Sequence, residues 1–250
     1  MFDYYGSKNT LAKFYQRPRF NLIIEPFAGS AMYSMYHLAR NKNMSAILVD
    51  KNPKVCDAWE WLRRQTVDSI MSIPAVKSGT VTSDFFIMNC AASTASLNCR
   101  KMTVSERMEK RQHSMWRKVA RLLWVIPRVS VVCGSYDTIE NTEATWFVDP
   151  PYQRTGTALL GNGYAKGCRS DDIDFSALSD WCKCRKGQVI VAEKQGATWL
   201  PFKPLRIVTD SQDKHYTEVV WNSLPNDQME FDFTPNDAPA AERKGDGDGR

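Results

Sequence analysis

An acidic residue, two prolines and an aromatic ring follow the apolar run Ala144 to Val148, in the order Asp149-Pro150-Pro151-Tyr152. Prolines cannot continue a strand ladder, and an acid at the carboxyl end of a buried strand faces a crevice. The stiff turn lets the carbonyl of Pro150 project beside the carboxylate of Asp149, while Tyr152 offers a flat face. Two adjacent acceptors and a ring fit an exocyclic amino group on a planar base. The alternative is a strand that stops at a Pro-Pro turn, with Asp149 as a local cap.

A strand, a turn of small residues and a helix lie far upstream of this turn. The run Asn21 to Glu25 predicts a buried strand, and Met32 to Arg40 has the apolar spacing of a helix. Such an arrangement lets a ligand approach the backbone at the carboxyl end of a sheet. The residues predicted to form this ligand site are Glu25, Pro26, Phe27, Ala28, Gly29 and Ser30.

Asp50 ends a second apolar run, Ala46 to Val49, about twenty residues after the glycine turn. In nucleotide-binding folds an acid at this place accepts hydrogen bonds from ribose hydroxyls. The alternative role for Asp50 is the N-cap of a helix that starts near Lys54. Residues 55–73 are predicted to be helical.

An aromatic residue, a glycine and a lysine stand close to the start of the chain. Tyr5, Gly6 and Lys8 could clamp a small ligand, because they combine a ring, a flexible turn and a cation. The alternative is a terminal arm that packs on the body of the protein.

Composition is that of an ordinary globular protein, with 250 residues, 43% hydrophobic residues and a net charge of +5. The sequence has no long apolar run and does not start like a secretion signal, so we expect a cytoplasmic protein that does not enter a membrane. The seven cysteines lack the paired spacing of a zinc site, so we predict reduced thiols and no metal.

Residues 75–128 interrupt the alternation of strands and helices, and no strand is predicted in them. Thr103 and Glu106 have the spacing of a capping box, which predicts a helix from there to about Ile126. Between Arg100 and Arg128 nine bases face two acids, an excess that favours phosphate binding over a merely solvated face. The residues predicted to contact nucleic acid are Arg100, Lys101, Arg107, Lys110, Arg111, Lys118 and Arg121.

Seven strands are predicted for one domain that spans residues 1–226. Besides the two early strands, they cover residues 128–133, 144–149, 187–192, 205–210 and 216–222. The last connection is too short for a parallel crossover, so the last strand is predicted to be antiparallel. Residues 153–170 form a glycine-rich stretch next to the DPPY turn (Asp149 to Tyr152). We expect this stretch to close over substrate, and the alternative is a disordered segment.

Residues 227–250 are acidic and polar, which predicts a disordered tail. Within them, Gln228 to Phe233 looks like the short peptides by which bacterial replication proteins dock on the sliding clamp. The two alternatives for this segment are a docking peptide for the sliding clamp and a chance match of six residues.

Together and in this order, Glu25 to Ala31, Asp50 and the DPPY turn resemble the alpha-group, Dam-like DNA adenine-N6 methyltransferases, many of them carried by phages. The resemblance covers about residues 2–222. It implies an α/β, Rossmann-like class I methyltransferase fold in which residues 75–128 are a small helical insert that recognises DNA. It also implies S-adenosylmethionine as the cofactor, no metal, and contacts to the cofactor from Tyr5, Gly6, Lys8, Ser135 and Tyr136.

Two positions depart from the family's pattern. The family's first motif ends in Gly where this chain has Ala31, and its third strand is often followed by Gly-Asp-Phe, where this chain has Gly134-Ser135-Tyr136-Asp137. The expected reaction is base flipping and direct methyl transfer to adenine N6, with the DPPY turn as the catalytic element. An RNA base-amino methyltransferase and a catalytically inactive DNA-binding relative are the alternatives.

Overall fold

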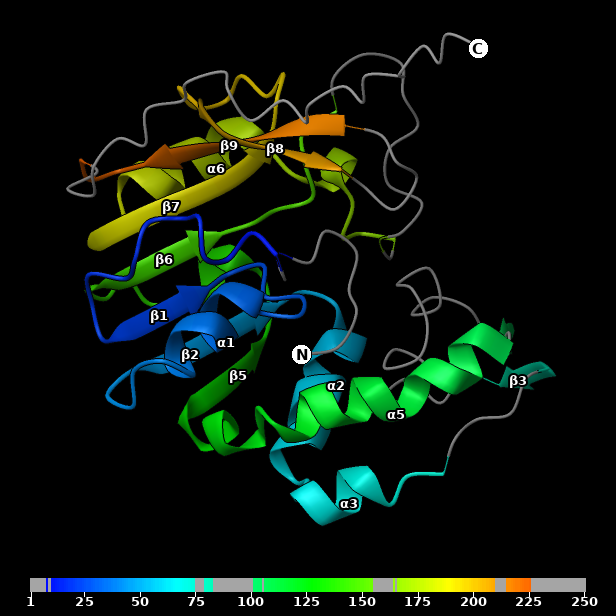
Figure 1. The fold of residues 1–250 in the computed structure, drawn as a ribbon. Coiled ribbons are helices and arrows are strands. Elements are labelled where there is room, and N and C mark those ends of the chain that lie inside the picture. Colours follow the sequence, from blue (N-terminus) through cyan, green and yellow to red (C-terminus); the bar gives the residue numbers. More distant parts are fainter. Residues whose placement is uncertain are drawn as a thin grey trace, which may run out of the picture.

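A seven-stranded mixed sheet organises the chain in the computed structural model (Figure 1). The structure describes Lys8, Tyr164 and residues 10–74, 79–82, 101–104, 106–154, 166–209 and 215–225. The strands of this sheet are β1 (Leu22–Glu25), β2 (Ser45–Asp50), β5 (Val129–Cys133), β6 (Ala144–Val148), β7 (Gly187–Lys194), β8 (Lys203–Thr209) and β9 (His215–Asn222).

The order across the sheet is β5-β2-β1-β6-β7-β9-β8. The first five strands in this order are parallel, whereas β9 runs antiparallel to both β7 and β8. The predicted seven strands and the predicted antiparallel last strand are therefore confirmed. The two central strands β1 and β6 also mark the switch point, where successive connections leave the sheet in opposite directions and a crevice opens.

Helices cover both faces of the sheet, because its central strands are apolar on both sides. On one face, α1 (Met32–Leu38) and α2 (Pro53–Arg63) pack with Ile23 and Phe147 in one core. On the other face, α6 (Phe175–Lys183) packs through Leu178 and Cys182 onto the neighbouring residues Ile24 and Trp146. Neighbouring residues of β1 and β6 thus point into opposite cores. Because both faces are buried, the strands cannot slip, and the residues at their carboxyl ends keep their positions.

The helix predicted over residues 55–73 is two helices, α2 and α3 (Val67–Met71). Thr66 breaks it: its hydroxyl accepts a hydrogen bond from the Ser69 amide at 3.1 Å, and the Ser69 hydroxyl accepts one from the Thr66 amide at 2.9 Å. This capping box starts a new helix at Val67. The apolar spacing continues through the break between the two helices, so spacing alone could not reveal it.

The insert is only partly as predicted. It contains an antiparallel strand pair, β3 (Gly79–Thr82) and β4 (Lys101–Val104), where no strand was predicted. Thr103 pairs with Thr80 in this ladder, so the predicted capping box is wrong, and α5 spans Glu106–Ala120 before a 3-10 turn, Leu123–Arg128. Short strands of Thr and Val with little apolar content give a weak signal, and their pairing decides the structure.

Helix α5 connects the insert to the body of the protein. Met115, Trp116 and Val119 are buried in the same core as α2, and Figure 1 shows α5 running from α2 outward to the strand pair. The insert thus extends on the side toward which the parallel strands point (Figure 1). No helix in the described part of the chain is both long and apolar enough to span a membrane.

Candidate active site

A pocket opens at the carboxyl ends of β1, β2, β5 and β6, where the switch point predicts a crevice. Its empty volume is about 880 Å³ with the open mouth included. The predicted site residues that line it are Lys8, Glu25, Pro26, Phe27, Ala28, Gly29, Ser30, Asp50, Ser135, Tyr136, Asp149 and Pro151. Pro150 and Tyr152 lie beside the pocket but do not line it, and Tyr5 and Gly6 lie outside the described residues.

The glycine turn is held in a shape that few residues adopt. Gly29 and Ala31 have φ values of 46° and 47°, in the left-handed region that favours glycine. The indole N–H of Trp59 donates to the carbonyl of Gly29 at 2.9 Å, and the Gly29 amide donates to Asp50 at 2.9 Å. Both neighbours fix the turn so that its backbone borders the pocket.

Ala31 stands where the family resemblance expects glycine, and the backbone shows what that departure costs. Among the described residues it is the only one other than glycine with a positive φ. A left-handed conformation costs an L-residue on the order of 1 kcal/mol. The turn keeps the shape that glycine would adopt freely, so the substitution strains the turn without closing it.

Both oxygens of Asp50 accept backbone hydrogen bonds. The Gly29 amide donates to Oδ2 at 2.9 Å, and the Asn52 amide donates to Oδ1 at 2.8 Å. The N-cap of α2 is Asn52, whose side chain accepts the Lys54 amide at 3.1 Å, so the alternative role of Asp50 as that cap is wrong. Burial raises the pKa of Asp50 to about 6, against the effect of these two amides. Each oxygen keeps acceptor capacity toward the pocket, which suits a pair of hydroxyls.

Glu25 has a structural partner in addition to its place in the pocket lining. It is buried, with 2% of its surface exposed, and its carboxyl group accepts the Ser34 amide at 2.7 Å. This bond ties the end of β1 to the first turns of α1. Burial raises the pKa of Glu25 to about 8, although the Ser34 hydrogen bonds favour the ionised form.

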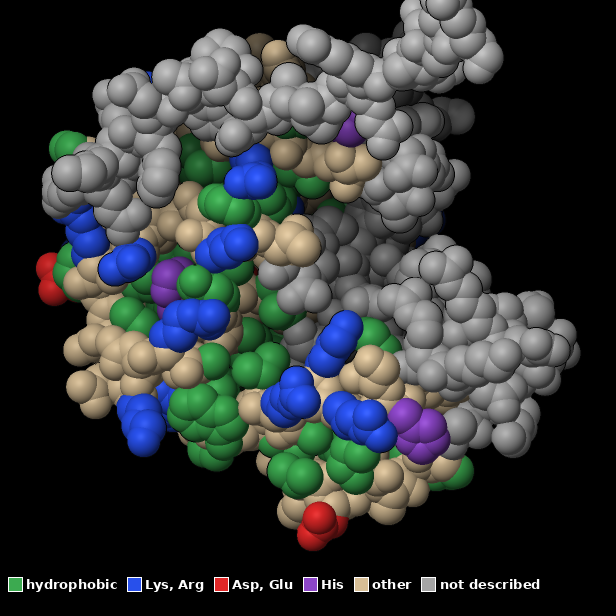
Figure 2. Space-filling view, in the orientation of Figure 1, with side chains coloured by type: hydrophobic (Ala, Val, Ile, Leu, Met, Phe, Trp, Pro, Cys, Tyr) green, Lys and Arg blue, Asp and Glu red, His purple; other side chains and the backbone are tan. Residues whose placement is uncertain are grey.

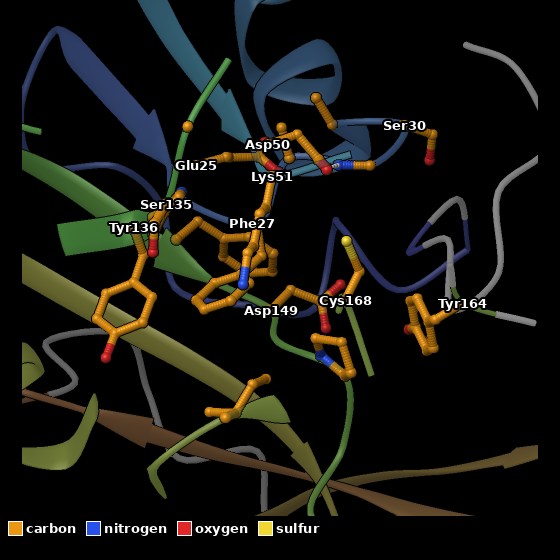
Figure 3. Close-up of a pocket in the computed structure, with 18 of the residues that line it drawn as sticks. Glu25, Phe27, Ser30, Asp50, Lys51, Ser135, Tyr136, Asp149, Tyr164 and Cys168 are labelled. Atoms are coloured by element: carbon orange, nitrogen blue, oxygen red, sulfur yellow. Dashed lines mark hydrogen bonds between the residues drawn. The ribbon is translucent and has the colours of Figure 1, made fainter. Parts of the chain in front are cut away.

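Aromatic rings form one wall of the pocket. The rings of Phe27 and Tyr136 are stacked, with centroids 5.4 Å apart and planes 27° apart, and Tyr136 meets Trp181 edge to face at 5.3 Å. Figure 3 shows Ser135 and Tyr136 on one side of the pocket, Tyr164 on the other, and Asp149 between them. Rings that are fixed by their neighbours suit a planar ligand.

Asp149 projects into the pocket from the end of β6 (Figure 3). Its Oδ1 atom lies 2.8 Å from the ammonium of Lys8, and no described residue donates a hydrogen bond to its other oxygen, Oδ2. Burial raises the pKa of Asp149 to about 6; the positive charge of Lys8 opposes this rise, and the charge of Glu218 adds to it. Lys8, predicted to contact a cofactor, therefore lines the pocket as the ion partner of Asp149.

Tyr152 is anchored at its hydroxyl. That group donates to Glu218, with distances of 2.8 and 2.9 Å to the two carboxylate oxygens, and the Lys8 ammonium lies 4.7 Å from the ring centroid. The following amide, of Gln153, donates to Glu193 Oε1 at 2.8 Å. The DPPY turn is thus tied to β9 through the Tyr152 hydroxyl and to β7 through the amide that follows the turn.

The exposed basic side chains of the insert lie on α5 and just after it. Lys118 and Arg121 are exposed, as is Arg117, which was not among the predicted contacts. Lys and Arg side chains gather where α5 lies, and few acids accompany them on that face (Figure 2). Arg107, Lys110 and Arg111 belong to α5 and Lys101 to β4, whereas Arg100 and the segment Gln228 to Phe233 lie outside the described residues.

Sequence reasoning missed part of the pocket and one buried carboxylate. The further lining residues are Ala31, Met32, Tyr33, Lys51, Gly134, Phe147, Tyr164, Gly167, Cys168, Asp172 and Ile173. Tyr164, Gly167 and Cys168 fall in the glycine-rich stretch, whose composition was the available signal. Glu218 sits in a strand that looks like any other, so the sequence gives no sign of its role. Among the described residues no cluster of His, Cys, Asp and Glu could hold a metal ion.

Solved structures are similar to this chain at low sequence identity. No protein-family profile and no curated protein matches the chain. A crystal structure of a mutant of MtNAS is similar with a TM-score of 0.35 and 11% identity, over 85% of this chain and 56% of that one. Precorrin-6y C5,15-methyltransferase from Geobacter metallireducens is similar with a TM-score of 0.33 and 10% identity, over 80% and 79% of the two chains.

This protein has the Rossmann-like class I methyltransferase fold. The order and directions of its strands decide this: numbered along the chain within the large sheet they run 3-2-1-4-5-7-6, with only the last strand reversed. The chain spans just over half the length of the first of the two compared structures, 56%. Activity, substrate and partners are therefore matters for proposal.

Proposed function

We propose that this protein is an S-adenosylmethionine-dependent DNA methyltransferase that methylates the N6 amino group of adenine. One observation carries the proposal: the Asp149 carboxylate enters the pocket with one oxygen bound to Lys8 and the other without a described donor. This acceptor stands at the carboxyl end of β6, and we propose the carbonyl of the next residue, Pro150, as the second acceptor for an amino group that has two N–H donors.

The opposite half of the pocket fits the cofactor. Asp50 can accept the two ribose hydroxyls, the stacked rings of Phe27 and Tyr136 can border the adenine, and the open backbone at Gly29 admits the amino-acid part. When bound, the cofactor supplies an electrophilic methyl group on a sulfonium.

The residues of the DPPY turn would orient the amino group and increase its reactivity. The lone pair of the adenine N6 atom is delocalised into the ring, and hydrogen bonds to Asp149 Oδ2 and to the Pro150 carbonyl localise it on nitrogen. With the cofactor bound, its methyl group would pass from sulfur to this nitrogen, and Asp149 would take up the N6 proton or pass it to water. A pKa of about 6 suits this carboxylate for the transfer.

DNA is proposed as the partner because the insert is basic and borders the pocket side of the sheet. An adenine must leave the duplex to reach Asp149, at a cost of a few kcal/mol. Contacts between phosphates and exposed bases such as Lys118 and Arg121 would offset this cost. Tyr152 would support the flipped base with the ring face opposite Lys8.

The test is transfer of labelled methyl from S-adenosylmethionine to duplex DNA, single-stranded DNA and RNA by the purified protein, followed by chromatography of the nucleosides. We expect label in N6-methyldeoxyadenosine. Label in RNA alone would favour the RNA methyltransferase, and cofactor binding without transfer to any substrate would favour the inactive relative.

A second arm tests the insert. Replacing both Lys118 and Arg121 by alanine should weaken DNA binding and reduce its salt dependence by about one ion for each phosphate that the protein no longer neutralises. Lys183→Ala on α6 is the matched control, because this lysine is an exposed helical base that pairs with Asp180. Equal binding by the double variant and the control would remove α5 from the DNA interface.

A further inference from the structure

A buried carboxylate from the last strand lies behind the DPPY turn. Glu218 is on β9 and has no exposed surface. In the strand register it stands opposite Lys194 of β7. Because β9 is antiparallel to β7, the first half of β9 lies at the carboxyl end of the sheet, which is the pocket's edge. A buried carboxylate is costly, and an apolar side chain of similar size is usually easier to accommodate.

Glu218 gathers three donors from three distant parts of the chain. The Tyr152 hydroxyl lies 2.8 and 2.9 Å from its two oxygens, the Tyr15 hydroxyl lies 2.5 Å from Oε1, and the Lys8 ammonium lies 3.8 Å from Oε1. These donors compensate the cost of burial. They also place the Glu218 carboxylate next to both the Tyr152 hydroxyl and the lysine that pairs with Asp149.

Lys8 is the link between the two carboxylates. Its side chain is 4% exposed, and its ammonium lies 2.8 Å from Asp149 Oδ1 and 3.8 Å from Glu218 Oε1. Although burial alone would lower the pKa of Lys8, the charges of Asp149 and Glu218 raise it above its ordinary value. The Lys8 ammonium therefore lies between the two carboxylates, closer to Asp149 than to Glu218.

We propose that Glu218 is a positioning residue for methyl transfer: it holds Lys8 and the Tyr152 hydroxyl, so that Asp149 is fixed through one oxygen and presents the other to the substrate amino group. The inference rests on the proposed function. Glu218 acts through Lys8 and Tyr152, since it does not line the pocket itself.

Glu218→Gln is the direct variant, because it keeps the shape and one acceptor oxygen but removes the charge. We expect kcat to fall by about 10- to 100-fold, a size common for groups that orient a reacting pair. The KM for S-adenosylmethionine should stay within about twofold, because the cofactor half of the pocket keeps its contacts.

The titration of Asp149 gives a readout that does not depend on activity. The negative charge of Glu218 raises the pKa of Asp149, so Glu218→Gln should lower that pKa, as followed by carbon-13 NMR of the aspartate carboxyl groups. Lys8 faces Asp149 directly. The other titratable groups around this pair are Glu25, Glu193, Tyr15, Tyr152 and Tyr216. None of them changes in this variant.

Tyr15→Phe is the matched control. It removes a buried hydrogen bond to the same carboxylate oxygen, 2.5 Å long in the wild type, and leaves every charge in place. We expect kcat within about threefold of wild type, a small effect by the scale of a single hydrogen bond. If Glu218→Gln does not fold, Tyr152→Phe cuts one of the two tethers instead and should lower kcat at unchanged cofactor affinity.

An unchanged kcat and an unchanged Asp149 titration in Glu218→Gln would overturn the inference, and so would equal losses in Glu218→Gln and Tyr15→Phe. A wild-type protein that methylates no DNA would instead refute the proposed function. The Asp149 titration would then still decide whether the Glu218 charge acts on that carboxyl group.

Discussion

The two halves of the pocket hold their acids by different means. Asp50, at the end of β2, is fixed by backbone amides of Gly29 and Asn52, which lie 21 and 2 residues away in the chain. Asp149, at the end of β6, is fixed by the ammonium of Lys8, which Glu218 holds from behind. Burial raises the pKa of both acids to about 6, yet one is held by the main chain and the other by a network of side chains.

This difference indicates a division of labour. Backbone amides give a rigid and local site, which suits a cofactor that has the same structure in every reaction cycle. A network of ionisable side chains can change its protonation, which suits the half where a proton is lost from the substrate. Substitutions should therefore separate the two halves.

The largest effect is expected at Asp149. Asp149→Ala should lower methyl transfer by about 100-fold or more, as is typical when a group that stabilises the transition state is removed, and should leave the cofactor dissociation constant within about twofold. Single-turnover transfer and calorimetric binding measure the two effects. Loss of cofactor binding together with transfer would mean that the two halves are not separate.

Asp50→Ala should give the opposite pattern. Two hydrogen bonds to ribose hydroxyls and the anchor of the Gly29 amide disappear, so cofactor affinity should fall by about 10- to 100-fold. At saturating cofactor, kcat should be much less affected. Asp50→Asn, which keeps one acceptor for the ribose, is the matched control and should have intermediate affinity, whereas equal affinity in all three proteins would exclude a ribose contact.

Glu25 should make the stability of the protein depend on pH. Its folded-state pKa of about 8 lies above its ordinary value of 4.5, so the folded protein keeps a proton that the unfolded chain releases. Stability therefore falls as pH rises between these values and remains reduced above about pH 8. Glu25→Gln can still accept the Ser34 amide and carries no proton to lose. At pH 8 its free energy of unfolding should exceed that of the wild type by on the order of 1 to 3 kcal/mol, and its stability should change less with pH.

Melting temperatures of wild type and Glu25→Gln across about pH 5 to 8 would check this difference. Part of the pH dependence should remain in both proteins, because burial also raises the pKa of Asp50, Asp149 and Glu193. Parallel curves for the two proteins would show that Glu25 is ionised in the fold.

The smallest effect is expected at Ala31 in the cofactor half. Ala31→Gly relieves the left-handed backbone but adds freedom to the unfolded chain, so the net gain should be about 0.5 to 1 kcal/mol. Urea denaturation measures this gain. A loss of stability would mean that the Ala31 side chain, which is 2% exposed, contributes more by packing than the turn costs.

The same contrast explains how far the sequence could predict the structure. The strands, the glycine turn and Asp50 were predictable, because short apolar runs and the small residues after them report on local structure. Glu218 was not, because its bonds to Tyr15 and Tyr152 join residues 203 and 66 positions apart. The strand pair of the insert and the start of α5 were also missed, since pairing of β3 with β4 overrode the local capping signal at Thr103.

The measurement that tests the central claim most directly is long-read sequencing with modified-base detection. It would compare DNA from methylation-deficient cells that express either the wild type or Asp149→Ala. The account predicts N6-methyladenine at a defined sequence with the wild type alone. Absence of the mark with both proteins, at equal expression and with cofactor binding intact, would contradict it.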